Sequence, residues 1–504
     1  MNISVLLETV SEMLPDRIAL TSHGRSITYS QLLEGARKRG EDLRRVSSNR
    51  PLGYVGGNTL TFPLALFTAA FGGVPFVPMN YRVKEREYEH YLSLSNAGVV
   101  VAEDRYLAVL EGAVQSARLP VSVIMMKDLP RVDDGLADSQ GESADALLLF
   151  TSGTSAAAKL VRLTHANLCS YVLETVAAGS ASENESALLV APPYHIAAAA
   201  NLLTSIYRGR RIVFMEAFDA REWLLTVNAD RITHAMVVPT MLARIVEALR
   251  FEPELAPMTL RNLSYGGSRP PDGLVESAVR VLPSTVGLVN AYGLTETSSS
   301  VAMLTPEDHV SAWGSTDSAA KARLRSVGRA IPGVELQILR EDGSQAIEGE
   351  SGEICIRGSQ VSKGYVGGQS RVDAEGWLHT RDLGRLDSEG YLFVDGRLDD
   401  LIIRGGENIN PHEIESVLCD HPAVRECLVF GTPDSEWGES ISAIVTGTSV
   451  VPAEELRTWV RARLAGYKVP TRIQWVDELP RNDLGKPLRS RANLLMMGSE
   501  SEGE

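Results

Sequence analysis

Strand-like and helix-like segments alternate between residues 146 and 294, and this alternation constrains the fold more than any other feature of the chain. Short apolar runs, of which ALLLF (146–150) and VGLVNAYG (286–293) are examples, are separated by segments such as TMLARIVEAL (240–249). In the longer segments, apolar residues recur at the spacing of an amphipathic helix. Such an alternation predicts a parallel sheet that is covered by helices on both faces. Residues 51–103 repeat the pattern less regularly.

The pattern changes near Arg325, where short strand-like segments follow one another with glycine and aspartate between them. This arrangement predicts a small β-barrel or meander. After Arg397 the chain mixes helical and strand patterns, which predicts a compact α+β unit. We therefore expect an α/β fold with a large N-terminal domain (1–397) of parallel α/β subdomains and a small β-barrel from about residue 325. A smaller, mobile α+β C-terminal domain is expected over residues 398–504, with a disordered tail.

The composition of the chain excludes several classes of partner. Its 504 residues, with a hydrophobic content of 44%, allow a large core. The formal charge of −15 is unfavourable for binding nucleic acid or anionic lipid. The N-terminus lacks the basic start and long apolar run of a signal peptide, and no apolar segment is long enough for a membrane span. We therefore expect a cytoplasmic protein, as a monomer or homodimer, without a nucleic-acid partner.

The cysteines do not indicate a metal site or a disulfide framework. None of them forms a C-x-x-C pair, and no cysteine–histidine cluster has the sequence spacing of a zinc site. We expect reduced and mostly buried thiols. The four residues are Cys169, Cys355, Cys419 and Cys427.

Five short motifs point to the chemistry of the chain. TSGTSAAAK (151–159) follows a strand-like run, and small hydroxyl residues in such a loop can direct N–H groups and hydroxyls at phosphate oxygens. YGLTE (292–296) follows another strand-like run, and open α/β sheets bind ligands at the carboxyl ends of their strands. HTRDLG (379–384), GRLDDLIIRGGENI (396–409) and RNDLGKP (481–487) lie downstream.

In this order and spacing, the motifs resemble the adenylate-forming (AMP-binding) superfamily, which includes acyl-CoA synthetases, aryl-CoA ligases, luciferases and peptide-synthetase adenylation domains. The resemblance covers most of the chain and is most specific between Tyr292 and Lys486. It implies an ATP-dependent carboxylic acid–CoA ligase that forms an acyl-adenylate and releases AMP and pyrophosphate. The implied ligands are ATP, Mg²⁺, CoA and a small carboxylic acid.

The resemblance assigns the first of these motifs to the β- and γ-phosphates of ATP. The motif departs from the family pattern at Ala156 and Ala158, where glycine and proline are usual, and at Leu160, where glycine is usual. Alanine narrows the freedom of the backbone relative to glycine, so these departures bear on loop mobility and turnover. An ordinary strand–helix connection is the alternative interpretation. The residues in family register are Thr151, Ser152, Gly153, Thr154 and Lys159.

The resemblance also implies the adenylate site. Tyr292 packs on adenine, Thr295 binds the α-phosphate, and Glu296 binds Mg²⁺, a hard cation that takes one or two carboxylates. An acid placed favourably at a helix N-terminus is the alternative for Glu296. Asp382 is implied to chelate the ribose hydroxyls, with Arg397 beside it. A strand-end segment implied to border adenine and the acid contributes Gly266, Gly267 and Ser268.

Members of the family rotate the small domain between two half-reactions, and the hinge falls at Asp399. Lys486 is implied to bridge the attacking carboxylate and the α-phosphate during adenylation. Gly405 and Gly406 are implied to let the pantetheine arm of CoA pass close to the backbone. His195 is implied to border the acyl pocket and thiol tunnel, and the alanines after it leave volume for an acid larger than acetate; a hydrogen-bonded core histidine is the alternative.

Two other functions stay open. A ligase that loads a carrier protein would share the adenylation chemistry, and CoA-dependent release of AMP would distinguish it from a CoA ligase. A degenerate, non-catalytic member that binds acyl groups or nucleotides is the second alternative, which the altered 151–159 motif suggests. No aspartate lies beside His195 to hold an α-amino group, which argues against amino-acid adenylation.

Overall fold

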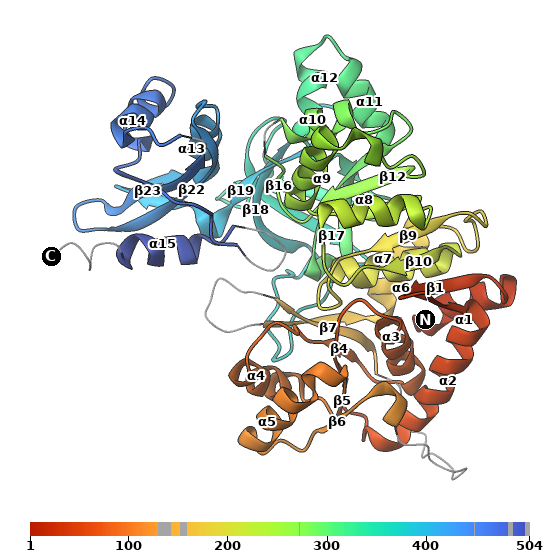
Figure 1. The fold of residues 1–504 in the computed structure, drawn as a ribbon. Helices are drawn as coiled ribbons and strands as arrows, with labels where there is room; N and C mark the ends of the chain where they lie inside the picture. Colours follow the sequence, from red (N-terminus) through yellow and green to blue (C-terminus); the bar gives the residue numbers. More distant parts are fainter. Residues whose placement is uncertain (130–142, 152–158, 272, 448, 482–486, 499–504) are drawn as a thin grey trace.

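A nine-stranded sheet lies at the centre of the larger part of the molecule (Figure 1). The computed structural model describes residues 1–129, 143–151, 159–271, 273–447, 449–481 and 487–498. Strands β13, β12, β11, β9, β10 and β1 run parallel, and β15, β14 and β2 pair antiparallel at the two edges. In sheet order from β15 to β2, the strands are Arg329–Ala330, Ser299–Leu304, Gly287–Leu294, Asn262–Gly266, His234–Val237, Ser186–Leu189, Arg211–Phe214, Ile18–Ser22 and Arg25–Thr28.

A second sheet of six strands contains the apolar run 146–150, so the alternating region is divided between two sheets. After residues 152–158 the chain returns as β8, antiparallel to β7. The strand–helix connection considered for this place is therefore wrong, because residues 159–164 pair as a strand and the next helix begins only at His165. In sheet order, β6, β5, β3, β4, β7 and β8 are Ser122–Ile124, Val99–Ala102, Leu52–Val55, Phe76–Pro78, Asp145–Thr151 and Lys159–Thr164.

Helices cover both faces of the nine-stranded sheet, as the alternation predicts. Neighbouring residues of β9 illustrate why: Leu188 packs in one core cluster and Leu189 in another, since successive side chains of a strand point to opposite faces. The cluster around Leu188 contains α8 (Ala220–Ala229), α9 (Pro239–Phe251) and α10 (Leu274–Val281). The cluster around Leu189 also includes strands of the second sheet and therefore joins the two sheets. Its helices are α1 (Ser4–Met13), α2 (Tyr29–Val46), α3 (Thr61–Gly72), α6 (His165–Thr175) and α7 (Ile196–Arg208).

The remaining helices of the larger part lie at its periphery. On the other side of the six-stranded sheet, α4 (Glu85–Ser95) and α5 (Leu107–Ala117) bury residues such as Leu92 and Leu110 against β5. Burying a leucine side chain fully contributes about 1.5–3 kcal/mol, so such contacts hold the helices in place. After β14 the chain forms α11 (Pro306–Gly314) and α12 (Ser318–Ala322).

Beyond Arg325 the structure changes to an antiparallel meander, as the sequence predicts. Four strands pair in the order β16-β17-β18-β19, each with its neighbour in the chain. They are Val334–Leu339, Gly352–Gly358, Leu378–Leu386 and Leu392–Arg397. Ile354 and Ile356 of β17 point into a core that this sheet shares with β14.

The C-terminal part is a separate α+β unit, in blue at the upper left of Figure 1. Its sheet has the order β21-β20-β23-β22, with β24 paired to β23, and its own apolar core. The strands from β20 to β24 are Ile402–Arg404, Glu407–Ile409, Val424–Asp434, Gly438–Gly447 and Arg472–Trp475. The helices are α13 (Pro411–Cys419), α14 (Ala453–Arg461) and α15 (Arg489–Gly498). In the described part of the chain, no helix has both the length and the apolar composition of a membrane span.

The junction between the meander and the C-terminal unit is a single short 3-10 turn, Leu398–Asp400. Asp399 of this turn pairs with Arg381 of β18, whose guanidinium Nη2 lies 2.9 Å from Oδ1. Asp400 pairs with Arg489 of α15 at 3.0 Å. Adjacent residues of the turn are thus bound to opposite sides of the junction. A rotation about Asp399 stays a prediction.

Candidate active site

The site begins at the carboxyl ends of two neighbouring parallel strands. Gly266, the last residue of β12, is paired with Ala291 of β13, one residue before Tyr292. A Cβ at Gly266 would collide with the Ala291 carbonyl oxygen, so the close approach of the two backbones requires glycine there. Gly267 has a φ of +89°, the left-handed region that glycine adopts without strain. Backbone geometry therefore accounts for both glycines. Ser268 follows them beyond the carboxyl end of β12.

The YGLTE motif does not lie wholly outside the strand. β13 continues to Leu294, and residues Thr295–Thr297 form a 3-10 turn, from which the chain reverses into β14. Thr295 and Glu296 are partly exposed in this turn, whereas Thr297 is buried. The turn therefore presents Thr295, the predicted phosphate ligand, and Glu296, the predicted metal ligand. Both lie at the end of the strand, as the sequence predicts.

Tyr292, Asp382 and Arg397 form one contact group, although they come from two different sheets. The Tyr292 hydroxyl donates to Asp382 Oδ2 at 2.7 Å, and Arg397 Nε lies 3.0 Å from Oδ1 of the same carboxylate. Asp382 and Arg397 are directly opposite each other in the β18–β19 pair. Burial raises the pKa of Tyr292 well above its ordinary value, and the Asp382 charge raises it further. The tyrosine is therefore a neutral hydrogen-bond donor at physiological pH.

A second contact group surrounds Glu296 and includes a residue that the sequence analysis missed. The Tyr365 hydroxyl donates to Glu296 Oε1 at 2.6 Å, and Lys159 Nζ lies 5.5 Å from the centroid of the Tyr365 ring. Burial, followed by the nearby Glu296 carboxylate, raises the pKa of Tyr365. Tyr365 thereby links the end of the predicted phosphate loop to the predicted metal ligand. A single tyrosine in a glycine-containing connection carries no sequence pattern that would reveal this position.

The segment between β17 and β18 is bonded to the YGLTE turn at several points. The Gln360 side-chain amide donates to the Thr297 and Ser300 carbonyls, both at 2.8 Å. The Ser362 N–H donates to the Glu296 carbonyl at 2.7 Å. Val366 N–H donates to the Leu160 carbonyl of β8. These bonds position Tyr365 between the two sheets.

The predicted phosphate loop is described only at its two ends. Thr151 ends β7 and Lys159 begins β8, and the two are paired across the hairpin. The Thr151 hydroxyl lies 3.5 Å from the Lys159 carbonyl oxygen. Lys159 is partly exposed beside Tyr365, so a cation is present where the motif predicts one. Ser152, Gly153, Thr154 and the predicted catalytic Lys486 lie outside the described residues.

The structure places His195 and the alanines after it at the start of α7. His195 immediately precedes α7, and its ring lies 4.6 Å from the ring of Tyr194. Ala198, Ala199 and Ala200 are buried inside the protein. Among these alanines, Ala197 remains partly exposed. The expectation that this segment leaves room for an acid larger than acetate stays a prediction.

Gly405 and Gly406 lie in the C-terminal unit, in the two-residue turn that joins β20 to β21. Their φ angles are +60° and +87°, as a type I′ hairpin turn requires. A Cβ at Gly405 would lie 2.8 Å from the Trp437 ring. The Gly405 N–H donates to the backbone carbonyl of Trp437. Turn geometry alone therefore explains both glycines, and their contact with pantetheine stays a prediction.

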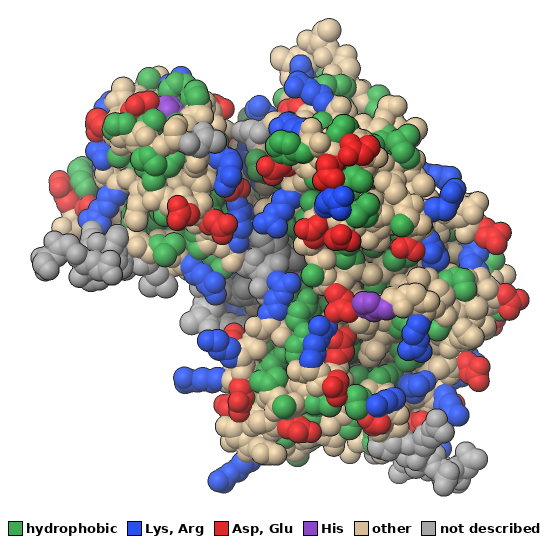
Figure 2. Space-filling view, in the orientation of Figure 1, with side chains coloured by type: hydrophobic (Ala, Val, Ile, Leu, Met, Phe, Trp, Pro, Cys, Tyr) green, Lys and Arg blue, Asp and Glu red, His purple; other side chains and the backbone are tan. Residues whose placement is uncertain are grey.

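Basic side chains are visible near the junction of the two parts despite the net charge of −15. Figure 2 shows Lys and Arg side chains on both sides of the hollow between the smaller lobe at the upper left and the larger part. Cations gathered at a concave surface raise the local concentration of anions. Asp and Glu side chains lie among them in the same view, so the charge beside the hollow is mixed.

Comparisons with known proteins agree with the geometry. A family model described as AMP-binding enzyme matches residues 7–366, and one described as AMP-binding enzyme C-terminal domain matches residues 413–486. Feruloyl-CoA synthase from an Amycolatopsis species is 32% identical over 490 residues, covering 95% of this chain and 96% of that protein. 2-Succinylbenzoate–CoA ligase from Bacillus licheniformis is 30% identical over 490 residues, covering 96% and 98%.

A solved structure has the same fold over nearly the whole chain. The o-succinylbenzoate CoA synthetase of Bacillus subtilis, in complex with its acyl-adenylate intermediate, superimposes with a TM-score of 0.82. The two proteins are 29% identical, and the match covers 97% of each chain. The same synthetase has also been solved with ATP and a magnesium ion, with a TM-score of 0.81, 29% identity and coverage of 96% of this chain and 98% of that one.

Proposed function

Because this chain belongs to the family of AMP-binding enzymes, we propose that it joins an aromatic carboxylic acid to CoA. The reaction class is ATP-dependent acid–CoA ligation through an acyl-adenylate, with release of AMP and pyrophosphate. Two relatives, a feruloyl-CoA synthase and a 2-succinylbenzoate–CoA ligase, support the aromatic class, since both substrates carry an aromatic ring.

One observation carries the residue assignments. Motifs that are far apart in the sequence meet in two adjoining contact groups, Tyr292–Asp382–Arg397 and Glu296–Tyr365–Lys159. The groups are joined by the turn that leads from Tyr292 to Glu296. Such a convergence of a buried donor, carboxylates and cations at the ends of parallel strands is typical of a nucleotide site.

In the first half-reaction, an oxygen of the substrate carboxylate attacks the α-phosphorus, a C–O–P linkage forms, and pyrophosphate leaves. Asp382 binds the ribose hydroxyls, and Tyr292 holds that carboxylate in place while it packs on adenine. Lys159 attracts the β- and γ-phosphates, with Thr151, Ser152, Gly153 and Thr154. Thr295 binds the α-phosphate. The adenine and the acid are bordered by the segment Gly266, Gly267 and Ser268.

Glu296 fits the role of a Mg²⁺ ligand. The Tyr365 hydroxyl orients one of its carboxylate oxygens without neutralising the charge, and the side chain remains partly exposed. Mg²⁺ takes one or two carboxylates and completes its shell with phosphate oxygens and water. When bound, the ion neutralises charge on the phosphates.

In the second half-reaction, the CoA sulfur attacks the acyl carbon, a C–S bond forms, and the C–O bond to AMP breaks. The thiol proton leaves to solvent. We assign Lys486 to the first step and Gly405 and Gly406 to the second, with the C-terminal domain (398–504) rotating against the N-terminal domain (1–397) about Asp399 between them. His195 borders the acyl pocket.

ATP–pyrophosphate exchange over a panel of acids tests both catalysis and substrate class. Ferulate and 2-succinylbenzoate represent the aromatic class, and acetate, hexanoate and decanoate represent aliphatic acids. Exchange that depends on an aromatic acid is expected. Faster exchange with an aliphatic acid would contradict the aromatic assignment while leaving the reaction class intact.

The acceptor requires a separate measurement. AMP release that increases when CoA is added identifies a CoA ligase. A carrier-protein ligase would instead respond to a phosphopantetheinylated carrier protein and not to CoA. No exchange with any acid, together with measurable ATP binding, would favour the non-catalytic alternative.

The assembly and location are part of the proposal. We propose a cytoplasmic enzyme, since ATP and CoA are its co-substrates, and a monomer or homodimer. Light scattering of the purified protein distinguishes the two assemblies, and fractionation of cells that express the full chain tests the location.

A further inference from the structure

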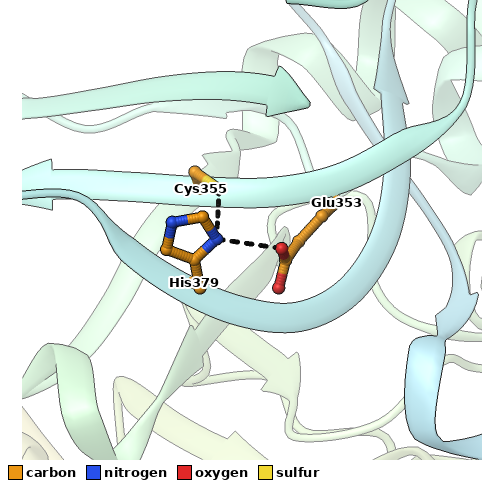
Figure 3. Close-up of side chains that lie close together, drawn as sticks. All are labelled: Glu353, Cys355 and His379. Carbon is orange, nitrogen blue, oxygen red and sulfur yellow. Dashed lines mark hydrogen bonds and ion pairs between the residues drawn. The ribbon is translucent and has the colours of Figure 1, made fainter. Parts of the chain in front are cut away.

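A glutamate, a cysteine and a histidine meet on the meander sheet, outside both contact groups of the adenylate site (Figure 3). Glu353 and Cys355 are two residues apart on β17, so their side chains leave the same face of the strand. His379 of β18 is paired directly opposite Cys355. Ile354, between the two, points to the opposite face and packs in the core.

An irregularity in the sheet brings Glu353 to the histidine. The β17–β18 pairing shifts register between Glu353 and Cys355, and the extra residues on β18 include Arg381, whose φ is +66°. Glu353 Oε1 accepts the Arg381 N–H at 2.9 Å, while Oε2 lies 2.9 Å from His379 Nδ1. Each carboxylate oxygen therefore has a partner, and Oε2 is directed at the imidazole.

The three ligand-type atoms have the spacing of a metal site. Cys355 Sγ lies 3.6 Å from His379 Nδ1, and the three atoms lie within 4.8 Å of one another. With Zn–S of about 2.3 Å and Zn–N of about 2.0–2.1 Å, a tetrahedral site places sulfur and nitrogen about 3.6 Å apart. The same geometry places nitrogen and oxygen about 3.4 Å apart, so the flexible glutamate has to withdraw by about 0.5 Å.

The surroundings favour a cation. Asp373 Oδ2 makes an ion-pair contact of 3.6 Å with His379 Nε2, the ring nitrogen that does not face Glu353 and Cys355. Glu353 and Asp373 bring two carboxylates into ion-pair distance of His379, and a divalent cation would compensate their negative charge. His379 and Glu353 are partly exposed, so an ion can enter from solvent.

We propose that Glu353, Cys355 and His379 bind one divalent transition-metal ion, with Zn²⁺ as the best match and a fourth position open to water. A thiolate with an imidazole selects Zn²⁺ over Mg²⁺ or Ca²⁺, which prefer oxygen ligands. Binding forms one metal–sulfur bond and releases the Cys355 proton to the buffer. The ion would fasten β17 to β18 beside Arg381, and this role is independent of the ligase reaction.

Metal titration of the chelator-treated full chain tests the proposal. Co²⁺ binding is followed by the thiolate-to-cobalt charge-transfer band, and Zn²⁺ binding by competition with Co²⁺. We expect one ion per chain and release of about one proton. Cys355→Ser should abolish the band, His379→Gln should weaken binding about 100-fold, and Asp373→Asn should weaken it about 10-fold, on the scale of losing a residue that orients a ligand.

The other close thiols supply the control. Cys419 Sγ and Cys427 Sγ lie 3.5 Å apart in the C-terminal unit, so they are the competing source of thiolate ligands. Cys427→Ser should leave the band and the affinity unchanged. A band that survives Cys355→Ser and disappears in Cys427→Ser would overturn the proposal. So would the absence of any Co²⁺ band in wild-type protein that circular dichroism shows to be folded, since His379 would then be simply an ion-pair partner of two carboxylates.

Discussion

The two regions that we propose to serve the ligase reaction are organised differently. In the N-terminal domain, Tyr292 is bonded to Asp382, and Tyr365 to Glu296, so side chains from distant parts of the sequence are held in contact within that domain. In the C-terminal domain, the Gly405–Gly406 turn makes its contacts within that domain. Groups held by their own domain are preorganised, whereas groups supplied by a second domain act when that domain is suitably oriented. Changes in the first region should therefore act through the nucleotide, and changes in the second should separate the half-reactions.

The largest effect is expected for Lys486→Ala. The proposed lysine stabilises charge as pyrophosphate leaves, and losing one such stabiliser lowers the rate by up to about 10³-fold. Adenylation, measured by ATP–pyrophosphate exchange, should fall on this scale, while thioester formation from supplied acyl-adenylate should remain. Lys321→Ala, an exposed lysine of α12, is the matched control. An equal loss of adenylation and thioester formation would contradict the assignment of Lys486 to adenylation alone.

A somewhat smaller loss, of about 10²-fold or roughly 2–4 kcal/mol in transition-state stabilisation, is expected for Glu296→Gln. The substitution keeps the size and the hydrogen-bond acceptor but removes the charge that would bind Mg²⁺. Adenylation measured against Mg²⁺ concentration should show a weaker response, with the KM for the acid unchanged. Glu307→Gln, on an exposed residue of α11, serves as the control. An unaltered Mg²⁺ dependence would remove Glu296 from the metal site.

Tyr365→Phe should have an effect of about 10-fold, the lower end for losing a residue that orients a metal ligand. Phenylalanine retains the ring beside Lys159 and loses the hydroxyl that donates to Glu296. The KM for Mg–ATP should rise, and the KM for the acid should not. Tyr391→Phe removes a different tyrosine hydroxyl, one bonded to Asp308, and should leave both constants unchanged. If only the KM for the acid substrate changed, Tyr365 would belong to the acyl pocket.

The smallest effect is expected for Arg381→Gly. Glycine tolerates the φ of +66° without strain, and the change removes the ion pair with Asp399. A partly exposed pair of this kind is worth about 0.2–1 kcal/mol, so the ratio of thioester formation to adenylation should shift by no more than about 5-fold. Asp399→Asn should shift the ratio in the same direction, and the double variant should add little. Fully additive effects would mean that the pair does not influence the junction.

Local patterns in the sequence predicted the elements that position the site. The strands at 186–189, 234–237, 262–266 and 287–294, and the helices α8, α9 and α10 between them, follow from apolar periodicity, because the spacing of buried side chains is a property of each segment alone. The division of the chain into two sheets did not follow. Which strand pairs with the run 146–150 depends on contacts with β4 and β8 that no local pattern encodes.

The same distinction between local patterns and tertiary contacts applies to single residues of the candidate site. Glu296, Asp382 and Lys159 were identifiable because their motifs have a recognisable order and spacing. Tyr365 was not, since its importance comes from a hydrogen bond to a residue 69 positions away. The Glu353–Cys355–His379 cluster was missed for the same reason: His379 is far from the other two in the sequence and becomes their neighbour by strand pairing.

By itself, the sequence determined the reaction class and many of the helices and strands, because periodicity and motif spacing are local properties of the chain. Tertiary structure decided which motifs meet. It brought Tyr292 against Asp382 and Tyr365 against Glu296, and it showed that the turn needs Gly405 and Gly406 for backbone reasons. The physical reason is that hydrogen bonds and ion pairs act over a few ångströms, and only the pairing and packing of strands bring residues that are distant in the chain within that range.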